Sequence, residues 1–279
     1  MKSMAVALIV LGLASVMRAD APFAEQHIGS DDPLERLVSD LSEIDTPAPG
    51  LAGLGTYSIF IAVDGAPDLS AGVLGEPLPS VPPQMRELVR RGLAALPVLI
   101  RHLSDGRPTK LTMEPHPILM NRLFGDEYDP RVRRSCEGER ASCLEAWIAQ
   151  HRHWKPINGS YRIRIGDVCF VLIGQIVNRS LEAVRYQPSG NMYVNSPVMT
   201  PSLAYKVRAD WDRLDAQGHE GSLRSDLKTG RMPAQALIRL RFYYPDAYAT
   251  LGGEDAGKRD EFEAREKLAR ERKADPTKP

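Results

Sequence analysis

The amino-acid sequence predicts a mainly α-helical fold with minor β structure and long loops rich in proline and glycine. Three observations support this fold class. Segment 85–103 places its apolar residues at the i, i+3, i+4, i+7 spacing of one helical face. Segment 168–179 is apolar on nearly every side, and its length suits three helical turns better than a strand. Segment 46–83, in contrast, is interrupted repeatedly by glycine and proline, which favours loops.

Length, composition and charge limit the classes of protein that fit. The chain has 279 residues, of which 43% are hydrophobic and 26% charged. This is enough for one large globular domain or two small ones. The 36 basic and 36 acidic residues balance to a formal net charge of zero. A nucleic acid is therefore not expected as a partner.

Residues 1–21 are predicted to be a signal peptide. Lys2 precedes an uncharged apolar run, Met4–Met17, which fits the hydrophobic region of a secretory signal and is short for a membrane span. Ala19-Asp20-Ala21 has the small-x-small pattern of a cleavage site. We expect an exported protein, periplasmic or secreted, with no stable membrane span after cleavage. The alternatives are an uncleaved anchor or a buried N-terminal helix.

The next two regions differ sharply in pattern. Residues 22–45 form an N-terminal helical segment, in which Pro33–Ile44 is amphipathic and Asp31 or Asp32 can cap the helix start. Residues 46–83 are a Pro/Gly-rich surface loop. Within it, only Tyr57–Val63 is expected to be regular, as a short strand.

Residues 84–250 are predicted to form a helical core domain. It begins with the 85–103 helix, which Pro97 should kink or split. An irregular region (104–134) and a helix at Ala141–Gln150 follow. Tyr161–Ile165 alternates as a strand does, and Asp167 is a suitable N-cap for the buried segment 168–179. We expect the 85–103 helix to pack against this buried segment.

The chain ends with further helices and a charged tail. The patterns predict three helices, at Pro201–Leu214, Gly221–Lys228 and Pro233–Tyr244. Residues 251–279 are a charged C-terminal tail whose i, i+4 ion pairs can support an exposed helix. Phe262 and Leu268 are too few to dock it firmly, so we expect a solvated tail; the alternative is a partner-binding helix.

One stretch carries a resemblance to a known class of proteins. Residues 88–103, with the run Gly92-Leu93-Ala94-Ala95-Leu96-Pro97 before a leucine-rich second half, resemble one unit of HEAT or armadillo helical repeats. The resemblance covers about twenty residues, and no clear second copy occurs at the expected spacing. Segment 166–179 also resembles uncharacterised exported bacterial proteins. The resemblance implies an irregular HEAT-like domain that binds another protein through a helical face.

Export makes the three cysteines informative. Cys136 and Cys143 lie in a polar segment, and a continuous helix would separate them by about 10.5 Å, too far for a disulfide. Gly138 lets the segment fold back, so we predict a Cys136–Cys143 disulfide; the alternative is two thiols. Cys169 lies in an apolar run and is expected to be a small buried hydrophobe.

A polar cluster near the end of the buried segment is the candidate ligand-binding site. It consists of Asn178, Arg179, Arg185, Tyr186 and Asn195. In the functional interpretation, Arg179 or Arg185 holds an anion beside the loop 190–197. In the structural interpretation, Gln175, Asn178 and Arg179 tie that loop to the core, since buried polar groups must be hydrogen-bonded.

Three other constellations have a simpler structural explanation. They are a histidine pair, a possible nucleophilic triad and a set of carboxylates: His151 and His153; His219, Ser222 and Asp226; Asp210, Asp212 and Asp215. The histidines lack a third zinc ligand, the triad lacks a glycine elbow, and the carboxylates mostly face solvent on a helix. The sequence predicts no metal, no cofactor and no catalytic residue.

The leading hypothesis is therefore an exported binding or structural protein of the cell envelope, whose partner is another protein. The alternative is a hydrolase or small-ligand-binding protein with its site near Arg179 and the loop 190–197.

Overall fold

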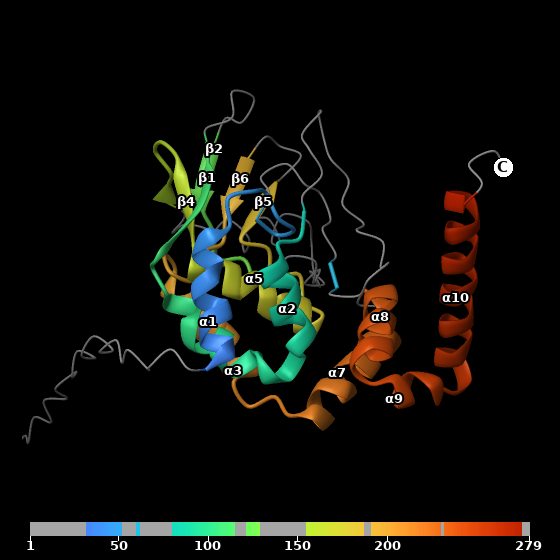
Figure 1. Ribbon diagram of the computed structural model, residues 1–279. Coiled ribbons are helices and arrows are strands. Elements are labelled where there is room, and N and C mark those ends of the chain that lie inside the picture. The colour runs from blue at the N-terminus through green and yellow to red at the C-terminus, as the bar shows by residue number, and fades with distance from the viewer. Residues whose placement is uncertain are drawn as a thin grey trace, which may run out of the picture.

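The computed structural model describes residues 32–51, 60–61, 80–114, 121–128, 155–186, 191–229 and 232–274. The prediction of a mainly α-helical fold with minor β structure is confirmed (Figure 1). The predicted signal peptide, the Cys136–Cys143 pair, the Ala141–Gln150 helix and most of the Tyr57–Val63 strand lie outside these residues. Among the described helices, none has the length and apolarity needed to cross a membrane.

Helix α5 (Ile165–Val177) is the centre of the fold, because all its residues except Gln175 are buried. Helices α1 (Pro33–Ser39), α2 (Pro83–Arg91) and α3 (Leu96–Arg101) pack against it, together with the short helices η1 (Asp40–Glu43) and η3 (His102–Ser104). Their apolar side chains join those of α5 in one core. The predicted packing of the 85–103 stripe on the buried segment is thus confirmed.

The 85–103 stripe is split into two helices, as predicted. Helix α2 ends where Gly92 adopts a φ of 54°, and a short helix, η2 (Gly92–Ala94), leads to α3. A Cβ atom at Gly92 would lie 2.7 Å from the Tyr243 ring, so a side chain there is excluded by both backbone and packing. Pro97 then occupies the first turn of α3, where its missing N–H costs little.

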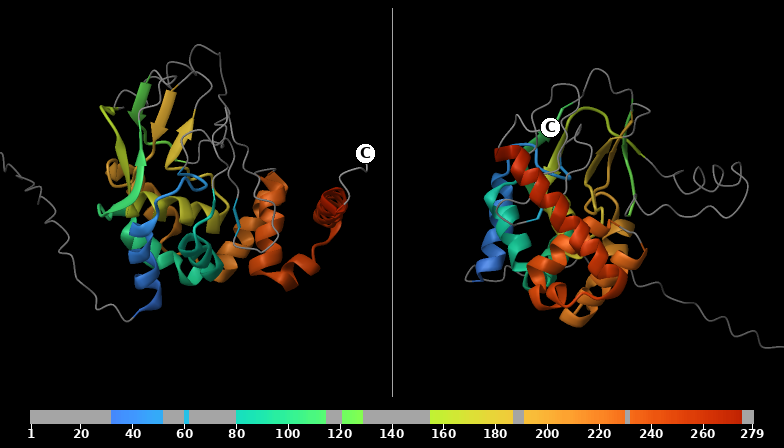
Figure 2. Two further views of the ribbon diagram at one scale, coloured as in Figure 1. Left: turned by 45° about the horizontal axis from the view of Figure 1, so that its top comes forward. Right: turned by 90° about the vertical axis from the view of Figure 1, so that its right-hand side faces the viewer.

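Two small sheets lie on one side of α5, opposite α1, α2 and α3 (Figures 1 and 2). In the first, β1 (Pro108–Met113) pairs antiparallel with β4 (Tyr161–Arg164). The second has the order β3-β2-β6-β5, comprising β3 (Lys155–Pro156), β2 (Asn121–Phe124), β6 (Asn191–Val194) and β5 (Val184–Tyr186). Its β2–β6 pair is parallel and its other pairs are antiparallel.

Two local expectations are corrected in this region. Part of region 104–134 forms β1 and β2 instead of irregular chain, and Pro108 is tolerated because it is the first residue of its strand. Asp167 is not an N-cap, because α5 begins two residues earlier, at Ile165. It lies in the first turn and accepts the backbone N–H of Arg164, the residue before the helix, at 2.9 Å.

The last third of the chain adds five helices, α6 (Pro201–Trp211), α7 (Ala216–Thr229), α8 (Pro233–Tyr243), α9 (Pro245–Ala249) and α10 (Gly253–Ala274). Helix α6 belongs to the main core, whereas α7, α8 and α9 share a second cluster that includes Leu223, Leu227 and Leu240. Helix α7 begins earlier than the expected Gly221, since Asp215 accepts the Gly218 N–H at 2.7 Å.

Helix α10 stands apart from the body over much of its length (Figures 1 and 2). It is attached mainly through long polar side chains: the Arg241 guanidinium donates to both Glu266 carboxylate oxygens at 2.8 and 2.9 Å. Lys258 donates to the Leu227 carbonyl at 2.9 Å, and Phe262 packs against the second cluster. Leu268 is exposed, so the apolar contribution is small, as its sequence predicts.

Candidate functional site

Two of the predicted site residues, Asn178 and Arg179, end helix α5 and lie in a buried polar cluster. Asn178 adopts a left-handed conformation with a φ of 58°, which lets it close the helix. Its side-chain amide donates to Asp226 at 2.8 Å, and the Arg179 guanidinium donates to the same carboxylate at 2.7 Å and to Ser222 at 3.1 Å.

The same cluster satisfies the last carbonyl groups of α5, which have no partner within the helix. Arg239 donates to the Gln175 carbonyl at 2.6 Å and His219 to the Ile176 carbonyl at 3.0 Å. Arg179 donates to the carbonyls of Val177 at 3.3 Å and Asn178 at 2.9 Å. Cationic donors also suit the negative end of the helix dipole. These side chains therefore anchor a buried helix end.

Burial controls the protonation of this cluster. It lowers the pKa of His219 to about 4, so the ring is neutral at pH 7, with Nε2–H donating to Ile176 and Nδ1 accepting from Tyr244 at 2.9 Å. Burial also lowers the pKa of Arg239 to about 10. Arg239 is therefore still charged at pH 7, and its hydrogen bonds to backbone and amide oxygens compensate for its burial.

Arg185 and Asn195 belong to a different cluster, beside the four-stranded sheet. Arg185 Nε donates to the Glu127 carboxylate at 2.6 Å. The Asn195 side chain accepts the Glu127 backbone N–H and donates to the Glu182 carbonyl, each at 3.1 Å. The side chain of Tyr186 lies outside the described part of the chain. These hydrogen bonds therefore place four of the predicted site residues in two clusters.

Half of the predicted loop 190–197 is a strand, because residues 191–194 form β6 between β2 and β5. The residues after it are fixed from inside. The Ser196 hydroxyl donates to buried Asp167 at 2.5 Å, and the Tyr161 hydroxyl donates to the same carboxylate at 2.7 Å. In this structure the segment is bound to the core, and Asp167 is one of the groups that hold it.

The cavity beside Arg179 and Arg239 is too small for a substrate. It measures about 10 Å³, roughly the space of one water molecule. It is lined by polar side chains that include Gln175, Gln235 and Ser180. Among the residues described, this region offers no room for a hydrolase substrate.

Five of the other sequence candidates have structural partners. His219, Ser222 and Asp226 lie on α7 and bond to α5 and its flanking residues, not to one another. Asp210 accepts the Tyr128 hydroxyl at 2.7 Å, and Asp215 accepts a backbone N–H at the start of α7. Asp212 is exposed and follows α6; His151 and His153 lie outside the described residues. No cluster of potential metal ligands occurs in the described ranges.

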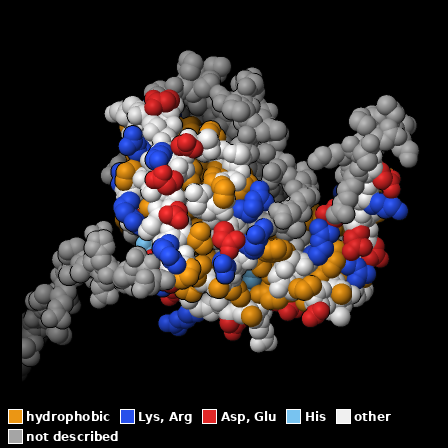
Figure 3. Space-filling model, in the orientation of Figure 1, with side chains coloured by type: hydrophobic (Ala, Val, Ile, Leu, Met, Phe, Trp, Pro, Cys, Tyr) orange, Lys and Arg blue, Asp and Glu red, His pale blue; other side chains and the backbone are white. Residues whose placement is uncertain are grey.

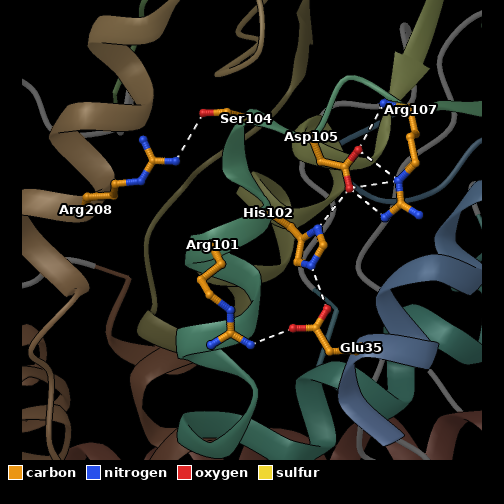
Figure 4. A network of polar contacts seen from close by, with 7 residues as sticks. All are labelled: Glu35, Arg101, His102, Ser104, Asp105, Arg107 and Arg208. Carbon is orange, nitrogen blue, oxygen red and sulfur yellow. Dashed lines mark hydrogen bonds and ion pairs between the residues drawn. The ribbon is translucent and has the colours of Figure 1, made fainter. Parts of the chain in front are cut away.

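Sequence reasoning missed an ionic network beside the N-terminal end of α5 (Figure 4). His102 Nδ1 lies 2.9 Å from Asp105 and its Nε2 lies 2.7 Å from Glu35 on α1. Arg101 donates to Glu35 at 2.6 Å, and Arg107 donates to Asp105 at 2.7 Å. Only the close spacing of residues 101–107 is visible in the sequence; nothing local indicates that Glu35 joins them.

A surface groove of about 440 Å³ lies between α1 and α2. Leu37 and Pro83 supply its apolar lining, whereas Arg86, Glu87 and Arg90 supply charges. The face shown in Figure 3 carries apolar side chains among positive and negative ones in the area of these helices. The groove between α1 and α2 is much larger than the cavity beside Arg179.

Comparison with protein-family models, curated proteins and solved structures finds no match for this chain.

Proposed function

We propose that this chain is an exported binding or structural protein of the cell envelope, which binds an acidic, amphipathic segment of a partner protein in the groove between α1 and α2. The observation that carries the proposal is the groove itself, with its volume of about 440 Å³ and its combination of apolar lining and arginines. A concave apolar surface with a few charged groups is the usual form of a recognition site.

The charge of α2 supports an acidic partner. Its nine residues include Arg86, Arg90 and Arg91 but only one carboxylate, Glu87. Glu87 is shared by Arg90 at 3.7 Å and Arg91 at 2.8 Å, so positive charge is in excess along this helix. Carboxylates on a partner would complement that excess and speed its encounter. An apolar side chain between them would contact Leu37 and Pro83.

The alternative function, a hydrolase or small-ligand site near Arg179 and segment 190–197, has less support. Arg179 and Asn178 are bonded to Asp226 and to backbone carbonyls, and the adjoining cavity holds about one water molecule. A ligand would have to displace the groups that cap α5.

Binding is tested with a labelled acidic peptide in which leucine is flanked by glutamates, using fluorescence anisotropy. We expect saturable binding that weakens as salt is raised, because exposed charges are screened. Arg86→Glu should weaken binding at least tenfold, as expected for a like charge at the contact. The matched control is Arg265→Glu on α10, whose parent side chain is 77% exposed. Equal binding by both variants would exclude the groove.

Export is tested separately by fractionating cells that express the full chain. The apolar run Met4–Met17 supports export, so we expect a chain in the exported fraction that lacks about the first 21 residues. Recovery of the intact chain in the cytoplasm would contradict the localisation without bearing on the groove.

A further inference from the structure

His102 is held between two carboxylates that come from different parts of the chain. Its Nε2 lies 2.7 Å from Glu35 and its Nδ1 lies 2.9 Å from Asp105 (Figure 4). A neutral imidazole has one N–H donor and one lone pair, whereas an imidazolium has two donors. Both contacts are hydrogen bonds only when both ring nitrogens are protonated. The geometry therefore selects the charged ring.

The two carboxylates depend on His102 to different extents. Asp105 follows η3 directly and also accepts from the Arg107 side chain at 2.7 Å and from its backbone N–H at 3.0 Å. Glu35 belongs to α1, and its other partner in the network, Arg101, is half exposed. When the ring loses a proton, its single N–H can serve only one carboxylate. Asp105 lies three residues from His102 on the same segment, whereas Glu35 lies on a separate helix, so the contact that can open is the one to α1.

When the ring is neutral, Arg101 is the cation that remains hydrogen-bonded to Glu35, and its side chain is half exposed. The charged and titratable residues on the elements packed near this contact are Glu35 and Arg36 on α1, Asp40 and Glu43 on η1, Arg86, Glu87, Arg90 and Arg91 on α2, Arg101 on α3, Asp105 and Arg107 after η3, Asp167 and Cys169 on α5, and Arg208 on α6. Glu43 pairs with Lys110, and Arg208 donates to Ser104. Burial raises the pKa of Cys169, which keeps its thiol neutral.

We propose that His102 is a pH-sensitive clasp that fastens α1 to η3 when the ring is doubly protonated and releases part of that hold when it loses a proton. Helix α1 has only seven residues, so it depends on such tertiary contacts more than a long helix does. Hydrogen bonds that the ring donates to Asp105 and Glu35 outweigh burial and raise the pKa of His102 above its usual value of 6.5. The clasp is therefore closed at pH values below that raised pKa, and it opens as the pH rises through it.

The clasp would also regulate the groove, because α1 supplies Leu37 to its lining. This consequence rests on the proposed function: the acidic partner should bind more weakly above the His102 pKa than below it. The clasp itself requires no partner, so its test is made on the chain alone.

The experiment follows hydrogen exchange of the α1 amides in the full chain from pH 5.5 to 9, corrected for the intrinsic dependence of exchange on pH, alongside an NMR titration of His102. We expect α1 protection to fall about tenfold as His102 titrates, the usual effect of losing a hydrogen bond to a charged group. The α5 amides should not change. Constant α1 protection across the titration would overturn the proposal.

Two variants separate the clasp from general loosening. His102→Gln should give low α1 protection that no longer depends on pH. Glu35→Gln should lower the pKa of His102, because one of the two carboxylates becomes neutral. Lys110→Ala, which breaks a nearby ion pair to η1, is the matched control and should retain the full response. A pH response that persists in His102→Gln would assign it to another group. Loss of peptide binding with an intact exchange response would count against the groove alone.

Discussion

The two ends of helix α5 are stabilised in opposite ways. Near its N-terminal end, His102 and Asp105, on and after η3, form a partly exposed network with Glu35 of α1. The backbone carbonyls of Asp105 and Arg107 accept the first N–H groups of α5. At its C-terminal end, buried Arg239 and His219 donate to the last carbonyls. Each end presents the charge that the helix dipole favours.

The difference in burial gives the two histidines opposite protonation states. His102 is 22% exposed and lies between two carboxylates, which raise its pKa. His219 is fully buried near Arg239 and Arg179, and burial lowers its pKa to about 4. We infer that the buried end of α5 fixes the fold, whereas the exposed end can respond to its surroundings.

The largest expected effect is at the buried end. Arg239→Met should lower the free energy of unfolding by about 3–5 kcal/mol, because the acceptors on Gln175 and Asn178 lose their donor inside the core. Urea unfolding measures this change. Arg91→Met, which removes a half-exposed ion pair on α2, is the matched control and should cost less than about 1 kcal/mol. Similar losses in both variants would refute the contrast between buried and exposed arginines.

The second effect is the pH dependence of stability from His219. Its pKa is lowered from 6.5 to about 4, so the unfolded chain binds more protons than the folded chain between these values. Stability must therefore fall as the pH is lowered from 6.5 through 4, by up to about 3 kcal/mol. Urea unfolding of the native chain and of His219→Gln at several pH values isolates this contribution. The difference between the two should shrink on acidification, and a constant difference would contradict the neutral ring.

This contrast also explains what could be predicted from the sequence. The helical stripe at 85–103, the buried segment and their packing follow from periodicity and apolarity, which are local signals. The structural interpretation of Asn178 and Arg179 correctly makes them anchors, but it assigns them to the loop 190–197, whereas their partners Asp226 and Arg239 lie on α7 and α8. The Asn178–Asp226 contact joins positions that are 48 residues apart in the sequence, and the Asn178–Arg239 contact joins positions that are 61 residues apart. The Glu35–His102 contact spans 67 positions and leaves no local pattern. Positions of polar partners depend on the tertiary fold, which composition and spacing do not specify.

The third prediction asks whether the exposed end is loosely packed as well as exposed. Gly166 lies in the first turn of α5, and a Cβ there would lie 2.5 Å from the Leu103 backbone oxygen. Gly166→Ala should cost about 1–3 kcal/mol, because overpacking exceeds the helix propensity that alanine adds. Gly221→Ala on α7 meets no atom within 4 Å, so as the matched control it should stabilise by about 0.5–1 kcal/mol. A stabilising effect of Gly166→Ala would mean that η3 can shift to make room for the methyl group, and that the N-terminal end of α5 is loosely packed as well as exposed.

The smallest effect is expected from Arg101→Ala. The Arg101 guanidinium lies 2.6 Å from the Glu35 carboxylate, closer than His102 at 2.7 Å, yet the Arg101 side chain is 51% exposed. Solvent screening should limit the loss of unfolding free energy in Arg101→Ala to less than about 1 kcal/mol at pH 7, even though the contact is short.

Together with His102, Arg101 overcomes burial and holds the pKa of Glu35 below its usual value, so in the variant that pKa should rise. A carboxylate with a lowered pKa stabilises the fold only while it is ionised. In the variant, the stability that Glu35 contributes should therefore be lost at a higher pH than in the native chain as the solution is acidified. NMR titration of Glu35 and urea unfolding at pH 4 and 7 test both expectations. A loss of several kcal/mol at pH 7 would show that exposure does not weaken this end of α5, and that the two ends differ in pKa alone.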